Sequence, residues 1–177
     1  MIKLTLTTAL TLALILPAAA QEAPTAMATF INLEGTEVGS VTLAQGDGTV
    51  AVTGELTGIT PGLHGFHFHE TGDCDASAAF ESAGKHFNPT AHQHGLENPE
   101  GPHAGDLPNV EAVAEGGVAV DLTTDLISLT EGDPAYVFDA DGTALVIHAG
   151  PDDNVTDPSG NSGDRVACAV IEANTTP

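Results

Sequence analysis

The sequence predicts an all-β protein, an eight-stranded antiparallel Greek-key β-sandwich or barrel with two long functional loops. Three observations favour this class. Short segments rich in β-branched residues recur, turns of glycine, asparagine and aspartate separate them, and few stretches have helical periodicity. Consecutive strands without intervening helices form antiparallel sheets. At 177 residues the chain suits one ordinary core, so we expect a single domain.

The expected strands begin with a hairpin. Residues 28–33 and 38–43 flank a Glu34-Gly35 turn, and residues 49–56 alternate apolar and polar side chains as a half-buried strand does. The remaining expected strands are residues 64–70, 109–112, 117–122, 144–149 and 165–172.

Two long irregular stretches separate these strands, residues 71–108 and 150–164. Loops of this length in a compact domain are usually functional or held in place by a fastener. Both stretches are therefore candidates for a functional site.

The N-terminal segment is organised as a secretory signal. Lys3 precedes an apolar run from Leu4 to Leu16, and a proline and three alanines lead to an expected cleavage after Ala20. The run is shorter than the roughly 20 apolar residues that a membrane helix needs. We expect a signal peptide at 1–20, a linker at 21–26, a domain at 27–177 and a secreted, periplasmic mature protein.

The chain has two cysteines, Cys74 and Cys168. An even pair in an exported protein usually forms a disulfide, because an unpaired thiol is reactive in an oxidising compartment. Two buried free thiols are the alternative. A disulfide would tie the middle of the chain to its end.

The charge balance is strongly acidic, with 25 acidic residues against 3 basic ones and a net charge of −22. Only Lys85 and Arg165 remain once the signal peptide is removed. Such a surface repels nucleic acid and anionic membranes, so neither is expected as a partner. The carboxylates are spread along the chain, which favours a role in solubility over a dedicated acidic tail.

Several histidines stand where they can bind metal. His67 and His69 lie two residues apart in an expected strand, so both side chains point to one face. A chance pair on a polar face is the alternative. His148 follows an apolar strand segment, where the alternative is a core histidine bonded to the backbone.

A second group lies in one loop rich in glycine and proline. It contains His86, His92, His94, His103 and Asp106. Three imidazole nitrogens and one carboxylate oxygen match the ligands of a structural zinc site, and a bound metal would order the loop.

The motifs around these residues resemble those of the copper/zinc superoxide dismutases. The resemblance covers about residues 28–171. It rests on six motifs in family order, namely residues 62–70, 84–89, 94–95, 103–109, 145–148 and 163–168.

The resemblance implies two metal sites that share one ligand. Copper would be bound by His67, His69, His86 and His148, and zinc by His86, His94, His103 and Asp106. Seven side chains make two four-ligand sites only if one is shared, and an imidazole has two nitrogens to share. His86 would bridge both metals as an imidazolate. Copper would be catalytic and zinc structural.

The implied activity is the dismutation of superoxide by cycling of Cu(II) and Cu(I). Arg165 would bind the superoxide anion beside copper, and His86 would accept and return a proton. Asp152 would orient a copper histidine and a zinc histidine from outside the two ligand sets. Cys74 and Cys168 match the family's intrasubunit disulfide, and a homodimer is possible.

Some features depart from the family pattern or have other interpretations. The family often guides its anion with lysines in the loop before the arginine, but residues 150–164 contain none. Lys85 could supply part of that positive field, or it could be an ordinary solvated lysine. We interpret His64 as structural and His92 as a surface residue. Two matches to glycosylation motifs, at Asn154 and Asn174, are of a kind common by chance.

The second hypothesis is a periplasmic copper and zinc binding or buffering protein without turnover. Arg165 favours the enzyme, because a buffer needs ligands but no cation that binds an anion. A purely structural sandwich needs neither metal ligands nor a cation that binds an anion.

Overall fold

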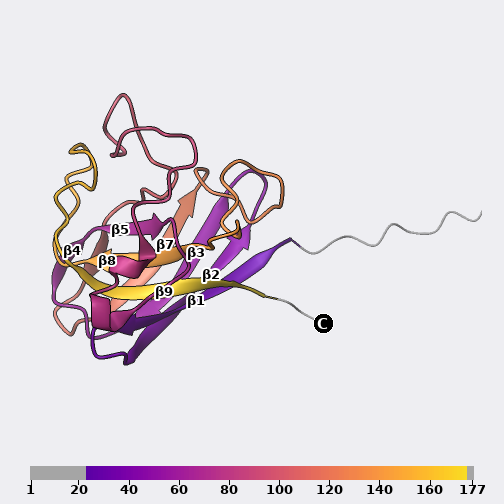
Figure 1. Cartoon of the computed structure of the whole chain (residues 1–177). Helices are drawn as coiled ribbons and strands as arrows, with labels where there is room; N and C mark the ends of the chain where they lie inside the picture. The colour runs from indigo at the N-terminus through magenta and orange to yellow at the C-terminus, as the bar shows by residue number, and fades with distance from the viewer. Residues whose placement is uncertain (1–22, 175–177) are drawn as a thin grey trace, which may run out of the picture.

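The computed structural model describes residues 23–174, which form a nearly closed antiparallel barrel (Figure 1). The predicted all-β antiparallel class is confirmed, with nine strands in the described part of the chain. The strands are β1 (Thr25–Asn32), β2 (Glu37–Gln45), β3 (Val50–Leu56), β4 (Gly62–His64), β5 (Phe66–His69), β6 (Val110–Ala112), β7 (Val118–Thr124), β8 (Ala144–His148) and β9 (Arg165–Ala173). Two single-turn 3-10 helices, η1 (Ala76–Ala78) and η2 (Glu81–Ala83), lie between β5 and β6.

The order of strands around the barrel is β4-β6-β7-β3-β2-β1-β9-β8-β5. β1, β2 and β3 form a meander, whereas the links from β3 to β4, β5 to β6 and β7 to β8 cross over other strands. β4 and β5 are the two edge strands of this sheet. The histidine-rich loop covers part of the β5 edge, because Phe68 N donates to Gly105 O and Phe87 N donates to Phe68 O. This pairing places the loop residues beside the strand that carries His67 and His69.

The ninth strand arises from a break at Gly65. We expected one strand over residues 64–70, but the structure divides it into β4, which pairs with β6, and β5, which pairs with β8. A Cβ atom at Gly65 would lie 2.8 Å from Ser162 Cβ and 3.0 Å from His67 Cε1. Only glycine lets the backbone pass this close to the loop between β8 and β9.

Alternating apolar side chains fill the barrel, as the sequence pattern predicts. Phe30 and Phe66 are fully buried, with ring centroids 6.1 Å apart, and Leu43, Val52 and Leu145 pack in the same cluster. Each such side chain contributes roughly 1.5–3 kcal/mol of burial free energy. The core supports the strands from which the site is built.

A third long connection, from residue 125 to residue 143, was not predicted. It has no regular strand, yet it is not loosely attached, because Ile127, Leu129 and Val137 are buried in the main core. Its apolar residues were too scattered to form a period of either helix or strand.

Two expectations concern the N-terminus. β1 begins at Thr25, so the last two residues of the expected linker at 21–26 belong to the sheet, and Ala26 is fully buried. The expected signal peptide lies outside the described residues. Among those residues no helix has the length and apolar character needed to cross a membrane.

The two long loops predicted to be functional meet at one end of the barrel. Figure 1 shows residues 88–108 in rose and residues 150–164 in gold at that end. A disulfide between Cys74 and Cys168 joins the segment after β5 to β9, across 94 residues of sequence. It thereby attaches the segment that contains η1 and η2 to the barrel wall.

Candidate metal centre

One cluster of four histidines lies at the edge of the barrel. His67 and His69 are on β5, His148 ends β8, and His86 pairs with His69 through an isolated bridge. One ring nitrogen from each lies within 4.8 Å of the others, and all four residues are buried. The predicted partners are thus brought together from three parts of the chain.

The inner nitrogens of this cluster have no hydrogen-bond partner. They are His67 Nδ1, His69 Nε2, His86 Nε2 and His148 Nε2. A buried polar atom without a partner costs about 1–3 kcal/mol, so four that face one another need an explanation. Four convergent nitrogen lone pairs fit a transition-metal cation.

Hydrogen bonds on the outer side of three rings fix which nitrogen faces inward. His69 Nδ1 donates to Gly84 O and His148 Nδ1 donates to Gly163 O, both at 3.0 Å. His67 Nε2 donates to the carboxylate of Asp152 at 2.5 Å. With its proton held on the outer nitrogen, each ring presents a free lone pair to the cluster.

A second cluster consists of His86, His94, His103 and Asp106. Asp106 Oδ1 lies 3.0 Å from His86 Nδ1, 3.0 Å from His94 Nδ1 and 3.4 Å from His103 Nδ1. The other oxygen, Oδ2, accepts from the backbone N–H groups of Gly95 and His103 at 2.8 and 3.0 Å. Asp106 is therefore anchored by one oxygen and turns the other toward three rings.

His86 belongs to both clusters. Its Nε2 is one of the unpartnered inner nitrogens of the first cluster, and its Nδ1 faces Asp106 in the second. Once its ring has lost the N–H proton, His86 can therefore serve two cations as an imidazolate, one on each side of its ring.

Asp152 connects the two clusters from outside. Its Oδ2 accepts from His67 Nε2 at 2.5 Å and its Oδ1 accepts from His94 Nε2 at 3.0 Å. Asn109 holds the backbone of Asp152 through two bonds of its side-chain amide, at 2.7 and 2.9 Å. A Cβ atom at Gly160 would lie 1.7 Å from Asp152 Oδ1, so the loop packs against this carboxylate only because residue 160 is glycine.

Burial keeps the histidines of the first cluster neutral. Loss of solvation lowers the pKa of His67 to about 3. Loss of solvation, together with the charges of His86 and Arg165, lowers the pKa of His148 to about 4. Burial and the same two neighbours hold the pKa of His69 well below its ordinary value, and burial lowers that of His86. These four rings are ready to bind a metal at neutral pH without first losing a proton.

The second cluster has the opposite electrostatic character. Burial disfavours the charged form of His94, but its contacts with Asp106 and Asp152 outweigh burial and raise its pKa to about 9. Burial would raise the pKa of Asp106, yet the three neighbouring histidines hold it well below its usual range. The two carboxylates that stabilise a proton on His94 would also stabilise a divalent cation.

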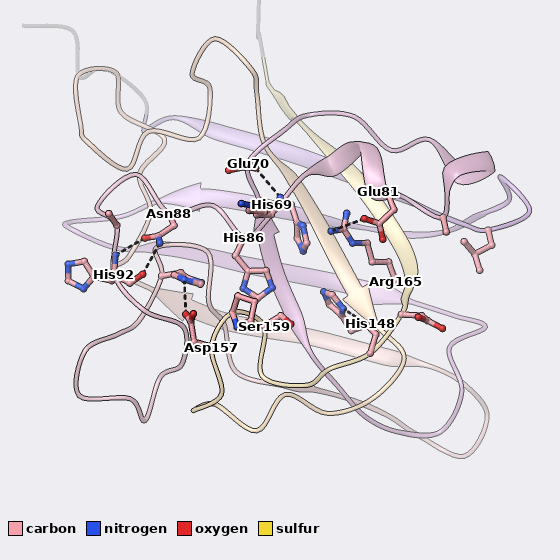
Figure 2. Close-up of a pocket in the computed structure, with 18 residues that line it drawn as sticks. His69, Glu70, Glu81, His86, Asn88, His92, His148, Asp157, Ser159 and Arg165 are labelled. Atoms are coloured by element: carbon pink, nitrogen blue, oxygen red, sulfur yellow. Dashed lines mark hydrogen bonds and ion pairs between the residues drawn. The ribbon is translucent and has the colours of Figure 1, made fainter.

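The first cluster opens onto a pocket of about 780 Å³ that contains Arg165 (Figure 2). Arg165 is largely buried and donates from Nη1 to Phe80 O at 2.5 Å and from Nη2 to Gly84 O at 2.6 Å. Gly84 O also accepts from His69, so one carbonyl connects the guanidinium to the first cluster. Arg165 and His148 lie side by side in Figure 2, and both line the pocket.

The structure also places the two remaining histidines. His64 is buried. Its Nδ1 lies 2.7 Å from the carbonyl oxygen of His148, and its Nε2 lies 2.7 Å from that of Thr60. His92 is exposed at the pocket rim and is held through its backbone by Asn88. Neither is part of a metal cluster among the described residues.

Sequence reasoning missed two residues that support the site, Asn109 and Asp157. The side chain of Asn109 hydrogen-bonds the backbone of Asp152, which lies 43 residues away in the sequence. The carboxylate of Asp157 accepts a hydrogen bond of 2.8 Å from the backbone N–H of His94, which lies 63 residues away. No local spacing signals such contacts, because they depend on how two loops meet.

A family comparison agrees with this geometry. The family model for copper/zinc superoxide dismutase (SODC) matches residues 37–171. The chain belongs to the copper/zinc superoxide dismutase family. The resemblance inferred from six motifs is thus confirmed.

Individual relatives of this copper/zinc superoxide dismutase family member cover most of its length. It is 44% identical over 147 residues to "Superoxide dismutase [Cu-Zn] 2" of Aquifex aeolicus, which spans 82% of this chain and 85% of that protein. It is 45% identical over 142 residues to "Superoxide dismutase [Cu-Zn]" of Caulobacter vibrioides, 78% of this chain and 80% of that one. The crystal structure of a double mutant of a SOD-like protein from Bacillus subtilis matches with a TM-score of 0.75 and 41% identity, covering 81% and 95% of the two chains.

Proposed function

We propose that the protein is a superoxide dismutase, which converts two superoxide anions and two protons to dioxygen and hydrogen peroxide. The observation that carries this proposal is the sharing of His86 between two clusters, the first of which opens onto a pocket that holds Arg165. This reaction needs a redox metal and a cation that attracts the anionic substrate. A second metal that shares His86 with the redox metal would tune it electrostatically. The names of the relatives support the same reaction.

We assign copper to the all-histidine cluster and zinc to the cluster with Asp106. Imidazole nitrogens suit copper, and three imidazoles with one carboxylate suit a closed tetrahedral zinc site. The first cluster would hold copper through His67, His69, His86 and His148, and the second would hold zinc through His86, His94, His103 and Asp106. Bound copper supplies a Cu(II)/Cu(I) couple that oxidises one superoxide and reduces the next.

Arg165 binds and orients the substrate in this proposal. The protein is strongly anionic, and Arg165 and Lys85 are the two cationic side chains in the pocket lining. Two backbone carbonyls hold the guanidinium, which has five N–H donors in all, so donors remain for an anion. A fixed donor costs little reorganisation when the substrate arrives.

His86 moves a proton in this proposal. His86 lines the pocket and its Nε2 is an inner nitrogen of the first cluster, and its lowered pKa means that the ring does not hold a second proton at neutral pH unless its surroundings change. When Nε2 is not holding copper, it can take up a proton in one half of the cycle and give it to the reduced oxygen species in the other. Nδ1, on the opposite side of the ring, would stay with the second cluster, which keeps the orientation of His86 constant.

We also propose that the protein is exported, with the periplasm as its location. The organisation of residues 1–20 as a signal segment supports this, and so does the disulfide, which is typical of oxidising compartments.

Loading the purified protein with copper and zinc and following the decay of superoxide tests the proposed activity. Bound metal is quantified in parallel, and metal-free protein and His148→Ala are the controls. Decay far above both controls supports the enzyme. Two metals bound per chain without accelerated decay would refute the dismutase and support the metal-binding alternative.

A further inference from the structure

The loop between β8 and β9 is fastened to the histidine-rich loop outside the two clusters. Glu97 N donates to Asn154 O at 3.0 Å, which joins two backbone segments. His94 N donates to Asp157 Oδ1 at 2.8 Å, which joins a side-chain carboxylate to the backbone of a residue in the second cluster. Asp153, by contrast, accepts from N–H groups of its own loop. The side chain of Asp157 therefore connects the two loops, whereas that of Asp153 does not.

The same oxygen of Asp157 approaches a second member of that cluster. Asp157 Oδ1 lies 3.8 Å from His103 Nε2, the contact drawn as a dashed line from Asp157 in Figure 2. This distance is too long for a hydrogen bond and short enough for a charge interaction. His103 turns its other nitrogen, Nδ1, toward Asp106, and that buried atom has no hydrogen-bond partner.

The chemistry of a metal-bound imidazole explains why a carboxylate lies beside His103 Nε2. A ring that binds a cation through Nδ1 carries its proton on Nε2, and that proton is normally received by a carboxylate, a carbonyl or water. For His94 the acceptor at Nε2 is Asp152. For His103 the carboxylate beside Nε2 is Asp157.

Building on the proposed zinc site, we propose that Asp157 is a positioning residue for zinc binding. Its carboxylate holds the backbone of His94 and orients the ring of His103. Asp152 and Asp157 come from the same loop, so one loop supports two zinc histidines. Because Asp157 also lines the pocket of Arg165, its carboxylate links the zinc cluster to one wall of that pocket.

Three variants separate the roles of the Asp157 carboxylate. Asp157→Asn keeps an oxygen for His94 N but removes the charge beside His103, and Asp157→Ala removes both. Asp164→Asn is the control for charge, because Asp164 lies on the same loop and its side chain makes no hydrogen bond or ion pair with the described residues. Zinc affinity is measured on the copper-free, disulfide-bonded full protein by competition with a chelator.

We expect Asp157→Ala to weaken zinc binding by about 10- to 100-fold, the usual effect of losing a partner of a metal ligand. Asp157→Asn should weaken it less, and Asp164→Asn should stay within about twofold of wild type. Amide hydrogen exchange at His94 should accelerate in Asp157→Ala and stay slow in Asp157→Asn. The ¹⁵N shift of His103 Nε2 in the zinc form should change in both.

Unchanged zinc affinity in Asp157→Ala, with His94 still protected, would overturn the proposal. If Asp157→Ala does not fold, Asp157→Asn decides, and an affinity equal to that of Asp164→Asn would overturn it. A wild-type protein that binds no zinc would instead refute the zinc site itself, so the two failures are distinguishable.

Discussion

Glu81 Oε2 lies 3.9 Å from Arg165 Nη2 at the mouth of the pocket. The carboxylate is 75% exposed, so water weakens its attraction for the guanidinium without abolishing its repulsion of an incoming anion. Glu81 therefore reduces the positive field that Arg165 presents to superoxide.

Glu81→Gln should raise kcat/KM for superoxide by about two- to threefold at low ionic strength, because it removes one negative charge beside the substrate's binding group. The gain should shrink as salt is added, since the Debye length falls to about 10 Å at 0.1 M. Stopped-flow decay of superoxide at several salt concentrations measures both effects. Glu97→Gln, which makes the same change away from the pocket lining, is the control. An equal gain in both variants would show that net charge alone is responsible.

The stability of the metal-free protein should have a maximum near pH 6.5. The folded-state pKa values of His67 and His148 lie below the ordinary 6.5, so the unfolded chain binds more protons and stability falls as the pH drops from 6.5 toward 4. His94 has a raised pKa of about 9, so its contribution is present below 6.5 and is lost as the pH rises toward 9. Each unit of pKa difference corresponds to about 1.4 kcal/mol.

Denaturant unfolding of the chelator-treated protein between pH 4 and pH 9 measures this profile. Loading with zinc should remove the decline on the alkaline side, because the cation replaces the proton at His94. A metal-free profile that is flat across the range would contradict the assigned pKa values.

Gly160→Ala should destabilise the protein strongly, because the new Cβ would lie 1.7 Å from Asp152 Oδ1 and 2.8 Å from His94 Nε2. Gly132→Ala is the matched control, since Gly132 also has a positive φ but has nothing within 4 Å of its Cβ position. We expect the free energy of unfolding to fall by at least about 2 kcal/mol more for Gly160→Ala. Equal losses in the two variants would mean that the loop moves away from Asp152 at little cost.

Replacing Cys74 and Cys168 with alanine should lower the free energy of unfolding by about 2–5 kcal/mol. It should also reduce substrate binding, because the segment attached by this disulfide contains Phe80 and Gly84, whose carbonyls hold Arg165. Denaturant unfolding and the KM for superoxide measure the two effects. A stable variant with wild-type KM would show that the loop is held by its other contacts alone.

Local patterns in the sequence predicted most of the barrel and both metal clusters. Alternation located the strands, and the two-residue spacing of His67 and His69 placed both rings on one face because strand geometry requires it. The resemblance of the motifs around His86, His148 and Asp106 to those of the copper/zinc superoxide dismutases then implied the other partners.

Features that depend on contacts between distant loops were not predictable in this way. The break at Gly65 depends on Ser162, and the role of Asp157 depends on His94, each far away in sequence. The connection over residues 125–143 was also missed, because its buried residues follow no secondary-structure period.

The most direct test of the central claim is the rate of superoxide decay with protein that carries both copper and zinc, compared among wild type, Arg165→Lys and Arg165→Ala at low and high salt. We predict fast decay in wild type, a loss of roughly tenfold or more in Arg165→Ala and a partial rescue in Arg165→Lys, which keeps the charge but not the fork of donors. Decay no faster than that of the metal-free protein, with both metals bound, would contradict the account.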